Sequence, residues 1–310
     1  MAETRNQYTY FTPLLGEVVN IHRISVVNFK GGVGKTTMTW LLAKYASESA
    51  RKKVLVFDTD AQMSLTVAVQ LQESEETFGQ FENWYEKRHL KNKKTIIDAI
   101  KSYGASDGKD LKFEVNSDFI YQLQPDLHFI PSTIELYWFE PNKVQRRSAG
   151  DFINALLSEI ERSEGVKYDY VFFDCPAYFT NLAYSVISST DHILIPVNPD
   201  VFASRGVEMM IEGLIRRIDP WPNPEISVFM NKARLYMGDL TRETARWWAE
   251  IKYVCSLFEQ RGFSIKAMES YIPERESIKR SIPGRFFPTE YVEYFSSLWN
   301  TIESSVKLKV

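Results

Sequence analysis

The sequence has 310 residues, 44% of them hydrophobic and 25% charged, which is enough apolar material for one large buried core. Its formal net charge is −3, so the overall charge carries no signature of a nucleic-acid-binding protein. The two cysteines, Cys175 and Cys255, exclude a framework of several disulfides, and we expect a reducing, cytoplasmic compartment.

Residues 1–20 are expected to form a short N-terminal extension. They show neither a signal-peptide pattern nor a helix-turn-helix pattern, and no apolar stretch of the sequence approaches the length of a membrane span. Residues 21–310 are expected to form one domain, because the motifs described below run from residue 30 to about residue 231.

A glycine-rich loop follows the first predicted strand, residues 24–27, and precedes a predicted helix, residues 38–46. The ordinary phosphate-loop pattern, G-x-x-x-x-G-K-S/T, needs a glycine where this chain has Phe29. The variant K-G-G-x-G-K-S/T, with an additional lysine at its head, fits instead. The loop reads Lys30-Gly31-Gly32-Val33-Gly34-Lys35-Thr36-Thr37.

The glycines let this loop curl so that successive N–H groups point at phosphate oxygens, and the following helix adds the positive end of its dipole. Lys35 would reach the β- and γ-phosphate oxygens, and the Thr36 hydroxyl would bind magnesium. A glycine-rich turn with incidental lysines is the alternative, but the flanking strand and helix favour a nucleotide site. Its predicted residues are Gly31, Gly32, Val33, Gly34, Lys35, Thr36 and Thr37.

Two further strands are predicted at residues 54–57 and 168–173, and a carboxylate follows each of them. Their unbroken apolar runs suit parallel strands covered on both faces, and ligands bind at the carboxyl ends of such strands. A single aspartate after a strand is often a helix cap, but Asp58 and Asp174 on separate strands indicate magnesium held with a triphosphate. The predicted metal site therefore consists of Thr36, Asp58 and Asp174.

The region from about residue 65 to about residue 127 is less regular, and we expect a helical insert on one edge of the sheet, for packing or for recognition of a partner. Later strands are predicted at residues 193–197, 226–230 and about 263–272, with helices between them. The sequence thus predicts an α/β fold: a P-loop nucleoside triphosphatase with a mostly parallel central sheet flanked by helices.

Three segments, residues 30–37, 58–62 and 169–176, resemble the deviant Walker A, Walker A′ and Walker B motifs of the ParA/MinD ATPases. The Asp-x-Asp-x-Gln form of the second segment, together with the Ile-Pro-Val-x-Pro-Asp form of residues 195–200, is nearer to the ParA branch than to MinD. The likeness covers roughly residues 21–285, so it extends over a whole domain.

The chain departs from the pattern of that family in two segments. Ala61 replaces a usual proline, and Ala177-Tyr178 replaces a second proline and a small residue. Neither change removes a predicted ligand, so we expect altered loop shape and kinetics and intact nucleotide binding.

The resemblance implies a slow, activator-stimulated ATPase that uses ATP and Mg²⁺ and forms a homodimer with ATP. In the family the second carboxylate of the aspartate motif, here Asp60, orients the attacking water. Lys30 is implied to cross to the partner's nucleotide and to supply charge in trans, as an arginine finger does, so the predicted catalytic residues are Lys30, Lys35 and Asp60. Asn231 is implied to contact the adenine edge, although a strand-end asparagine is just as often a turn residue.

The resemblance also implies non-specific DNA binding by the ATP dimer, association with the nucleoid, and a ParB-like or other cargo-bound activator. The cargo would be a plasmid, a chromosome origin or a protein assembly. Residues 232–285 are locally basic and would form the DNA surface; a solvated surface with ordinary ion pairs is the alternative. The candidate DNA-binding residues are Arg275, Lys279, Arg280 and Arg285.

A MinD-like positioning ATPase that associates with a membrane is the second function considered. Residues about 289–306 have the apolar spacing of a helix, but Glu290, Glu293 and Glu303 lie on its polar face. This pattern favours a helix that docks on the core over a lipid anchor. An iron–sulfur reductase of the same superfamily is not indicated, because neither cysteine has glycine-rich flanks.

Overall fold

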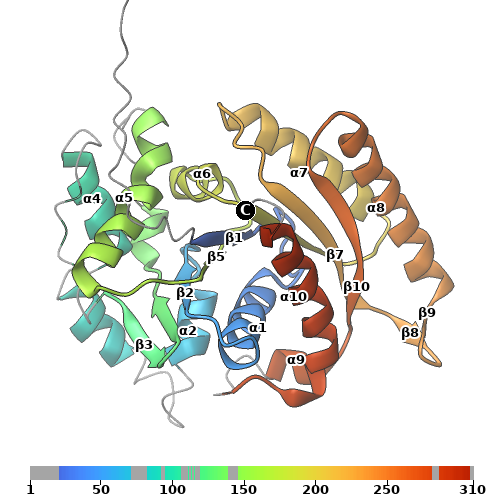
Figure 1. Cartoon of the computed structure of the whole chain (residues 1–310), viewed down its shortest axis with the longest axis horizontal. Coiled ribbons are helices and arrows are strands. Elements are labelled where there is room, and N and C mark those ends of the chain that lie inside the picture. The colour runs from blue at the N-terminus through green and yellow to red at the C-terminus, as the bar shows by residue number, and fades with distance from the viewer. Residues whose placement is uncertain are drawn as a thin grey trace, which may run out of the picture.

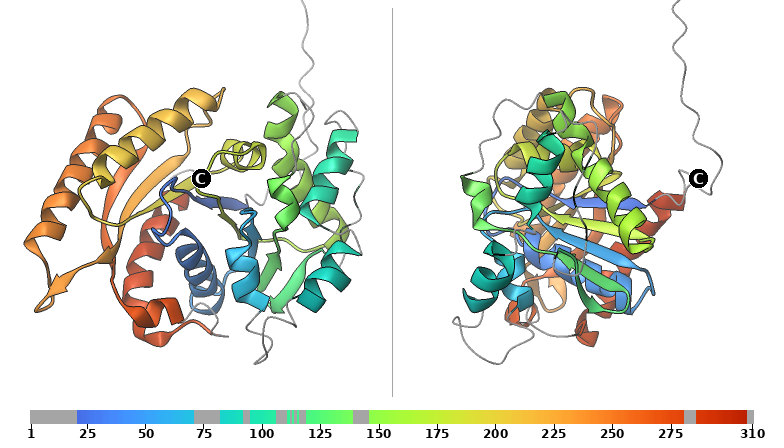
Figure 2. Two further views of the ribbon diagram at one scale, coloured as in Figure 1. Left: turned by 180° about the vertical axis from the view of Figure 1, so that it is seen from behind. Right: turned by 90° about the vertical axis from the view of Figure 1, so that its left-hand side faces the viewer.

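The computed structural model describes residues 21–70, 82–91, 95–105, 119–138, 146–280 and 286–307, together with residues 111, 113 and 115. The predicted N-terminal extension lies outside the described residues. Within them, an eight-stranded sheet of order β10-β7-β6-β1-β5-β2-β4-β3 crosses the molecule, and helices cover both of its faces (Figure 1, Figure 2).

The sheet is parallel throughout except for its last pair, β4 and β3, which is antiparallel. The residues of β2, β5 and β6 are all buried, as expected for apolar strands covered on both faces. The strands are β1 (His22–Val26), β2 (Val54–Asp58), β3 (Tyr121–Gln124), β4 (Leu127–Ile130), β5 (Tyr170–Asp174), β6 (His192–Val197), β7 (Glu225–Ala233) and β10 (Ile265–Pro273). A separate small hairpin consists of β8 (Leu235–Tyr236) and β9 (Asp239–Leu240).

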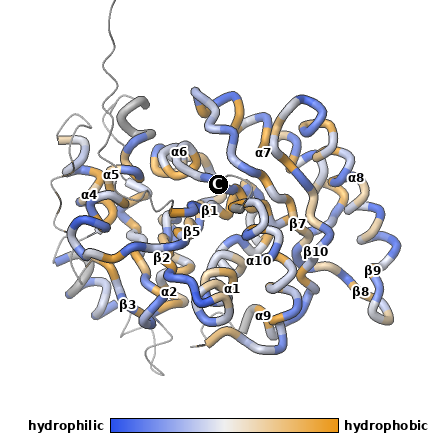
Figure 3. Tube along the Cα trace, viewed as in Figure 1, coloured by the Kyte–Doolittle hydropathy of each residue, from blue (hydrophilic) through white to orange (hydrophobic). Residues whose placement is uncertain are grey.

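Two hydrophobic cores lie on the two faces of the sheet. One contains residues of α1, α2, α9 and α10, and the other contains residues of α4, α5, α6, α7 and α8. Polar and apolar residues alternate along outer helices such as α5, α7 and α8, which is typical of amphipathic helices that pack on a sheet (Figure 3). The helices are α1 (Lys35–Glu48), α2 (Ser64–Gln70), η1 (Tyr85–Leu90), α4 (Ile96–Ala105), η2 (Ile134–Tyr137), α5 (Arg146–Glu164), α6 (Asn181–Ser188), α7 (Ala203–Arg217), α8 (Arg242–Gln260), α9 (Glu276–Arg280), η3 (Thr289–Tyr291) and α10 (Val292–Lys307).

The predicted α/β fold with a mostly parallel sheet is confirmed, but its edge differs from the prediction. The sequence indicated no strand between residues 58 and 168, whereas β3 and β4 lie there. Both strands have four residues, and the two glutamines of β3 hide its alternation, so neither stands out as an apolar run. Within the predicted helical insert, the described residues form α2, η1 and α4 as well as β3, and the boundaries of the insert stay a prediction.

Helix α10 packs its apolar face against α1 and β10. Phe295, Leu298 and Ile302 on this face are fully buried in the core that contains α1. These are the side chains that a lipid anchor would have to expose. No helix among the described residues is long and apolar enough to cross a membrane.

The order of the strands determines where a ligand binds. From β1 the chain goes to β2 on one side, and after β5 it continues with β6 on the other side of β1. Open α/β sheets bind ligands beside such a change of direction, outside the carboxyl ends of the strands. The parallel strands β1, β2, β5, β6 and β7 all end at this edge, so the segments that follow them meet there.

Candidate nucleotide site

The glycine-rich loop joins β1 to α1, and Gly34 is the last residue before the helix. Gly34 has φ 93°, in the left-handed region that favours glycine, and a Cβ atom built on it would lie 2.3 Å from Asn231 Nδ2. The loop therefore needs a glycine at this position for two separate reasons, one of backbone conformation and one of space.

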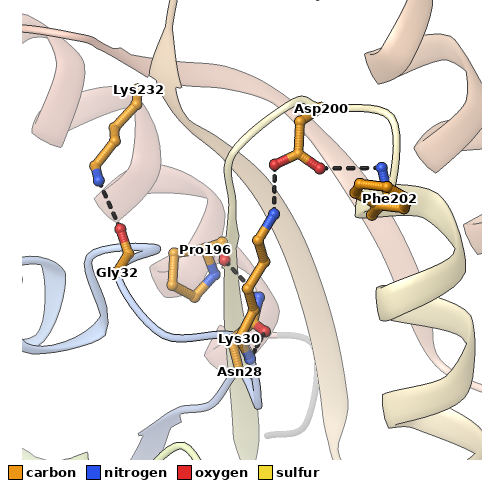
Figure 4. Close-up of polar contacts among 7 residues, drawn as sticks. All are labelled: Asn28, Lys30, Gly32, Pro196, Asp200, Phe202 and Lys232. Carbon is orange, nitrogen blue, oxygen red and sulfur yellow. Dashed lines mark hydrogen bonds and ion pairs between the residues drawn. The ribbon is translucent and has the colours of Figure 1, made fainter.

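Two consecutive residues of β7 hold the loop from outside. Asn231 is buried and donates through Nδ2 to the carbonyl oxygen of Val33 at 2.7 Å. Lys232 Nζ donates to the carbonyl oxygen of Gly32 at 2.5 Å (Figure 4). The predicted contact between Asn231 and adenine stays a prediction, because here the amide nitrogen binds the loop.

The two predicted metal carboxylates lie side by side. Asp58 and Asp174 are the last residues of β2 and β5 and are register partners in neighbouring parallel strands. Each is 1% exposed. Asp58 Oδ2 accepts hydrogen bonds from the backbone N–H and the hydroxyl of Thr66, at 2.8 and 2.7 Å. Asp174 Oδ1 lies 3.4 Å from the Thr39 hydroxyl, and among the described residues Asp174 Oδ2 has no hydrogen-bond partner.

The electrostatics of this pair favour a bound cation. Burial raises the pKa of Asp58 to about 7, although its hydrogen bonds with Thr66 oppose the change. Burial, followed by the neighbouring charge of Asp58, raises the pKa of Asp174 well above its usual range. Burial lowers the pKa of Lys35, and the carboxylates of Asp174 and Asp60 oppose this. An unpartnered carboxylate oxygen beside a second buried carboxylate and the Thr36 hydroxyl is an oxygen donor set that fits Mg²⁺.

Asp60 lies next to this pair, and hydrogen bonds with nearby residues hold both its backbone and its side chain. Its N–H donates to Asp58 Oδ1 at 3.1 Å, and its Oδ1 accepts from the N–H of Gln62 at 3.0 Å. The hydroxyl of Ser132, in the segment after β4, donates to the carbonyl oxygen of Asp60 at 2.7 Å. The structure thus places Asp60 beside the predicted metal carboxylates with one side-chain oxygen fixed.

A stacked pair of tyrosines stands beside Asp60, and the sequence did not indicate it. Tyr137 of η2 and Tyr178 of the segment after β5 stack with ring centroids 6.3 Å apart and an interplanar angle of 15°. Burial, with the charge of Asp60 as the next cause, raises the pKa of Tyr178 to about 12. Tyr178 is one of the residues that depart from the family pattern, and in the sequence this departure was the only sign of the tyrosine pair.

Lys30 points away from the loop. Its N–H donates to Asn28 Oδ1 at 2.8 Å, and Asn28 Nδ2 donates to the carbonyl oxygen of Pro196 at 2.9 Å. Its ammonium forms an ion pair with Asp200, in the segment between β6 and α7 (Figure 4). Both side chains of this pair are partly exposed, at 46% and 39%.

The locally basic stretch 232–285 is not one free cationic face. Arg234, Lys252 and Arg261 form ion pairs with acidic residues of neighbouring elements, and Lys232 binds the loop. Arg275 is exposed between β10 and α9. Lys279 and Arg280 belong to α9, but their side chains are outside the described part of the structure, as is the whole of Arg285.

The chain is similar to several known proteins. A family model described as an AAA domain matches residues 21–228. A putative replication protein A from Rhizobium rhizogenes is 31% identical over 203 residues, which are 63% of this chain and 45% of that protein. The chromosome-partitioning ATPase Soj from Treponema pallidum is 23% identical over 203 residues, which are 65% of this chain and 66% of Soj. The chain thus spans about half to two thirds of the length of these relatives.

The fold is also found among solved structures. A putative plasmid partition protein from Borrelia burgdorferi, solved with bound AMPPNP, has a TM-score of 0.64. It is 20% identical, and the superposition covers 94% of this chain and all of that one. At this identity the likeness concerns the fold alone.

We expect Gly34→Ala to abolish nucleotide binding. The new Cβ would clash with Asn231, and the alanine would have to adopt the left-handed backbone conformation that Gly34 has now. The loop would therefore have to change shape. Gly206→Ala in α7 is the control, because a Cβ there meets open space. Titration with a fluorescent ATP analogue measures both; wild-type affinity in Gly34→Ala would show that the loop tolerates the side chain.

The pKa of Asp58 predicts how stability depends on pH in the protein free of ligands. Because the folded pKa is raised from 3.8 to about 7, the folded chain binds a proton that the unfolded chain has released. The free energy of unfolding should therefore fall as the pH rises from about 4 to about 7. Asp58→Asn should remove this part of the slope, measured by urea unfolding in EDTA. An identical slope in the variant would contradict the assignment.

Proposed function

The chain belongs to the family described as an AAA domain and to the ParA/MinD family of P-loop ATPases, and on this basis we propose that it binds Mg-ATP at the loop and hydrolyses it slowly. One observation carries this proposal: two buried carboxylates end neighbouring strands beside a lysine-containing phosphate loop, and one of their oxygens has no partner among the described residues. Without a bound cation, the repulsion between two buried carboxylates so close together is relieved by protonation.

Each residue has a separate role in this proposal. The backbone N–H groups of the loop bind the phosphates, and Lys35 contacts the β- and γ-phosphate oxygens. Thr36, Asp58 and Asp174 hold Mg²⁺, which neutralises part of the phosphate charge when it is bound. Asp60 orients the attacking water with a carboxylate whose other oxygen is fixed by Gln62. Asn231 contacts the adenine edge with Oδ1, since its Nδ2 binds the loop.

Dimerisation is the second part of the proposal. Lys30 would leave Asp200 and reach the nucleotide of a second copy of the chain. An exposed ion pair of this kind stabilises a protein by about 0–1 kcal/mol. A catalytic cation supplied in trans contributes a factor of about a thousand or more, which corresponds to about 4 kcal/mol. The gain exceeds the cost, so the ion pair with Asp200 does not prevent the lysine from acting in trans.

The change between monomer and ATP-bound dimer would serve to position DNA or a protein cargo. Soj, which is similar over most of this chain, is a chromosome-partitioning ATPase, and the similar Borrelia protein is a putative plasmid partition protein. We infer that the ATP dimer binds DNA without sequence specificity, associates with the nucleoid and is stimulated by a ParB-like or other cargo-bound activator. The buried apolar face of α10 disfavours the alternative of a MinD-like membrane-associated ATPase.

Lys30→Ala is the test of catalysis in trans. We expect the variant to bind ATP with wild-type affinity but to lose ATP-dependent dimerisation and at least a thousandfold in turnover. Lys266→Ala, an exposed lysine on β10, is the matched control. Size-exclusion chromatography with ATP and a phosphate-release assay give the two readouts. Turnover at the wild-type rate in Lys30→Ala would show that this lysine is not catalytic.

The DNA surface is tested by replacing its four candidates, Arg275, Lys279, Arg280 and Arg285, with alanine. We expect the ATP-bound wild type to lose DNA affinity steeply with salt, and each phosphate contact removed should lower the slope of log K against log salt by about 0.9. Arg216→Ala with Arg217→Ala on α7 is the control for a general loss of positive charge. DNA binding that is absent, or that is insensitive to salt, would refute the proposed surface.

A further inference from the structure

Lys232 lies in the basic stretch that suggested a DNA surface, yet its contact is with the phosphate loop. Its ammonium donates to the carbonyl oxygen of Gly32, and the preceding residue, Asn231, donates to the next carbonyl, that of Val33. Consecutive side chains of a regular strand point to opposite faces of the sheet. Two neighbours that reach the same loop therefore need a local change in the strand.

An irregularity in the pairing of β7 with β10 provides this change. Met230 pairs with Tyr271 and Ala233 pairs with Pro273, so β7 advances by three residues where β10 advances by two. This additional residue of β7 is a bulge-like irregularity in the ladder, and such irregularities redirect side chains. Lys232 also has φ 54°, in the left-handed region that residues other than glycine seldom adopt. The backbone thus adopts an unfavourable conformation that directs a lysine at the loop.

The ammonium of Lys232 faces the loop and not a carboxylate of the described residues. Arg234 and Lys252 in the same stretch do face a carboxylate, within 3.3 Å. Lys266 and Arg275 are exposed on the surface and also form no ion pair with the described residues. Lys232 forms no ion pair within the described residues, and its partner is a neutral carbonyl of the loop. An ammonium has three N–H donors, and this bond uses one of them. Within the described residues, this positive charge has no acidic partner and lies beside the residues that would hold phosphate.

The structure assigns Lys232 to the nucleotide site, as a positioning residue that holds Gly32 from β7 and adds positive charge for a polyphosphate ligand. This inference rests on the proposed function for the identity of the ligand, a nucleoside triphosphate. It removes Lys232 from the candidate DNA surface. The end of β7 then lines the nucleotide site, although β7 lies two strands away from β1 in the sheet.

Two variants separate the ammonium from the backbone. Lys232→Met keeps most of the aliphatic stem and removes the charge, whereas Lys232→Gly also relieves the left-handed conformation. We expect both to weaken binding of Mg-ATP about tenfold, because the site loses a positive charge and the loop loses a contact that holds it in place before the ligand binds. The loss should be smaller for AMP, which carries fewer phosphate charges. KM should rise while kcat changes by less than about twofold, because the contact concerns binding.

The melting temperature and a control distinguish this role from a structural one. Lys232→Gly should have a melting temperature no lower than that of the wild type and should still bind ATP weakly. If the lysine had only a structural role, a variant of undiminished stability would bind ATP normally. Lys266→Met, an exposed lysine of the same basic stretch, should bind ATP as wild type does. Lys232→Met should leave the salt dependence of DNA binding unchanged.

Three outcomes are decisive. Wild-type ATP affinity in both Lys232 variants would overturn the assignment, as would a reduced salt slope for DNA together with normal ATP affinity. If the wild-type chain itself bound no Mg-ATP, the proposed function would fail instead. Measurements on the wild type and on the variants therefore distinguish the two failures.

Discussion

The constraint on which this structure depends is the burial of two carboxylates at the ends of neighbouring parallel strands. Asp58 and Asp174 are register partners, so the ladder that joins β2 to β5 fixes their separation. Removing an ion from water costs several kcal/mol even after relaxation, and two like charges add repulsion. The raised pKa values of both groups express this cost. The site is thereby suited to a divalent cation, which would offset the repulsion between the two carboxylates.

The parts of the site differ in how firmly the protein holds them. Hydrogen bonds from Thr66 fix Asp58, and those with Gln62 and Ser132 fix the backbone and one oxygen of Asp60. The loop is held from outside by Asn231 and Lys232. A binding site held in this way loses little conformational freedom when the ligand arrives. Lys30 is held less firmly, because its ion pair with Asp200 is exposed and therefore weak. The lysine can leave Asp200 for a group that binds it more strongly.

The surfaces away from the site are less distinctive than the sequence suggested. In the basic stretch 232–285, several cations form ion pairs on different elements, one lysine binds the loop, and others, such as Lys266 and Arg275, are exposed. Helix α10, whose spacing also suits a membrane helix, has its apolar face in the core. In both cases the sequence indicated a binding surface, for DNA or for a membrane. Whether the side chains are free to bind depends on their neighbours in the folded protein.

Local patterns in the sequence determined the class of fold and most of the candidate site. The glycine-rich loop and the aspartates after two apolar strands could be predicted because each depends on residues close in the chain and on the rule that parallel strands end at one edge. The tertiary structure decided the contacts of Asn231 and Lys232 with the loop, the partner of Lys30 and the tyrosine pair beside Asp60. These contacts join residues up to 200 positions apart, and they depend on strand order, on a bulge and on a left-handed residue. No local pattern encodes such features, because they arise only when the sheet has formed.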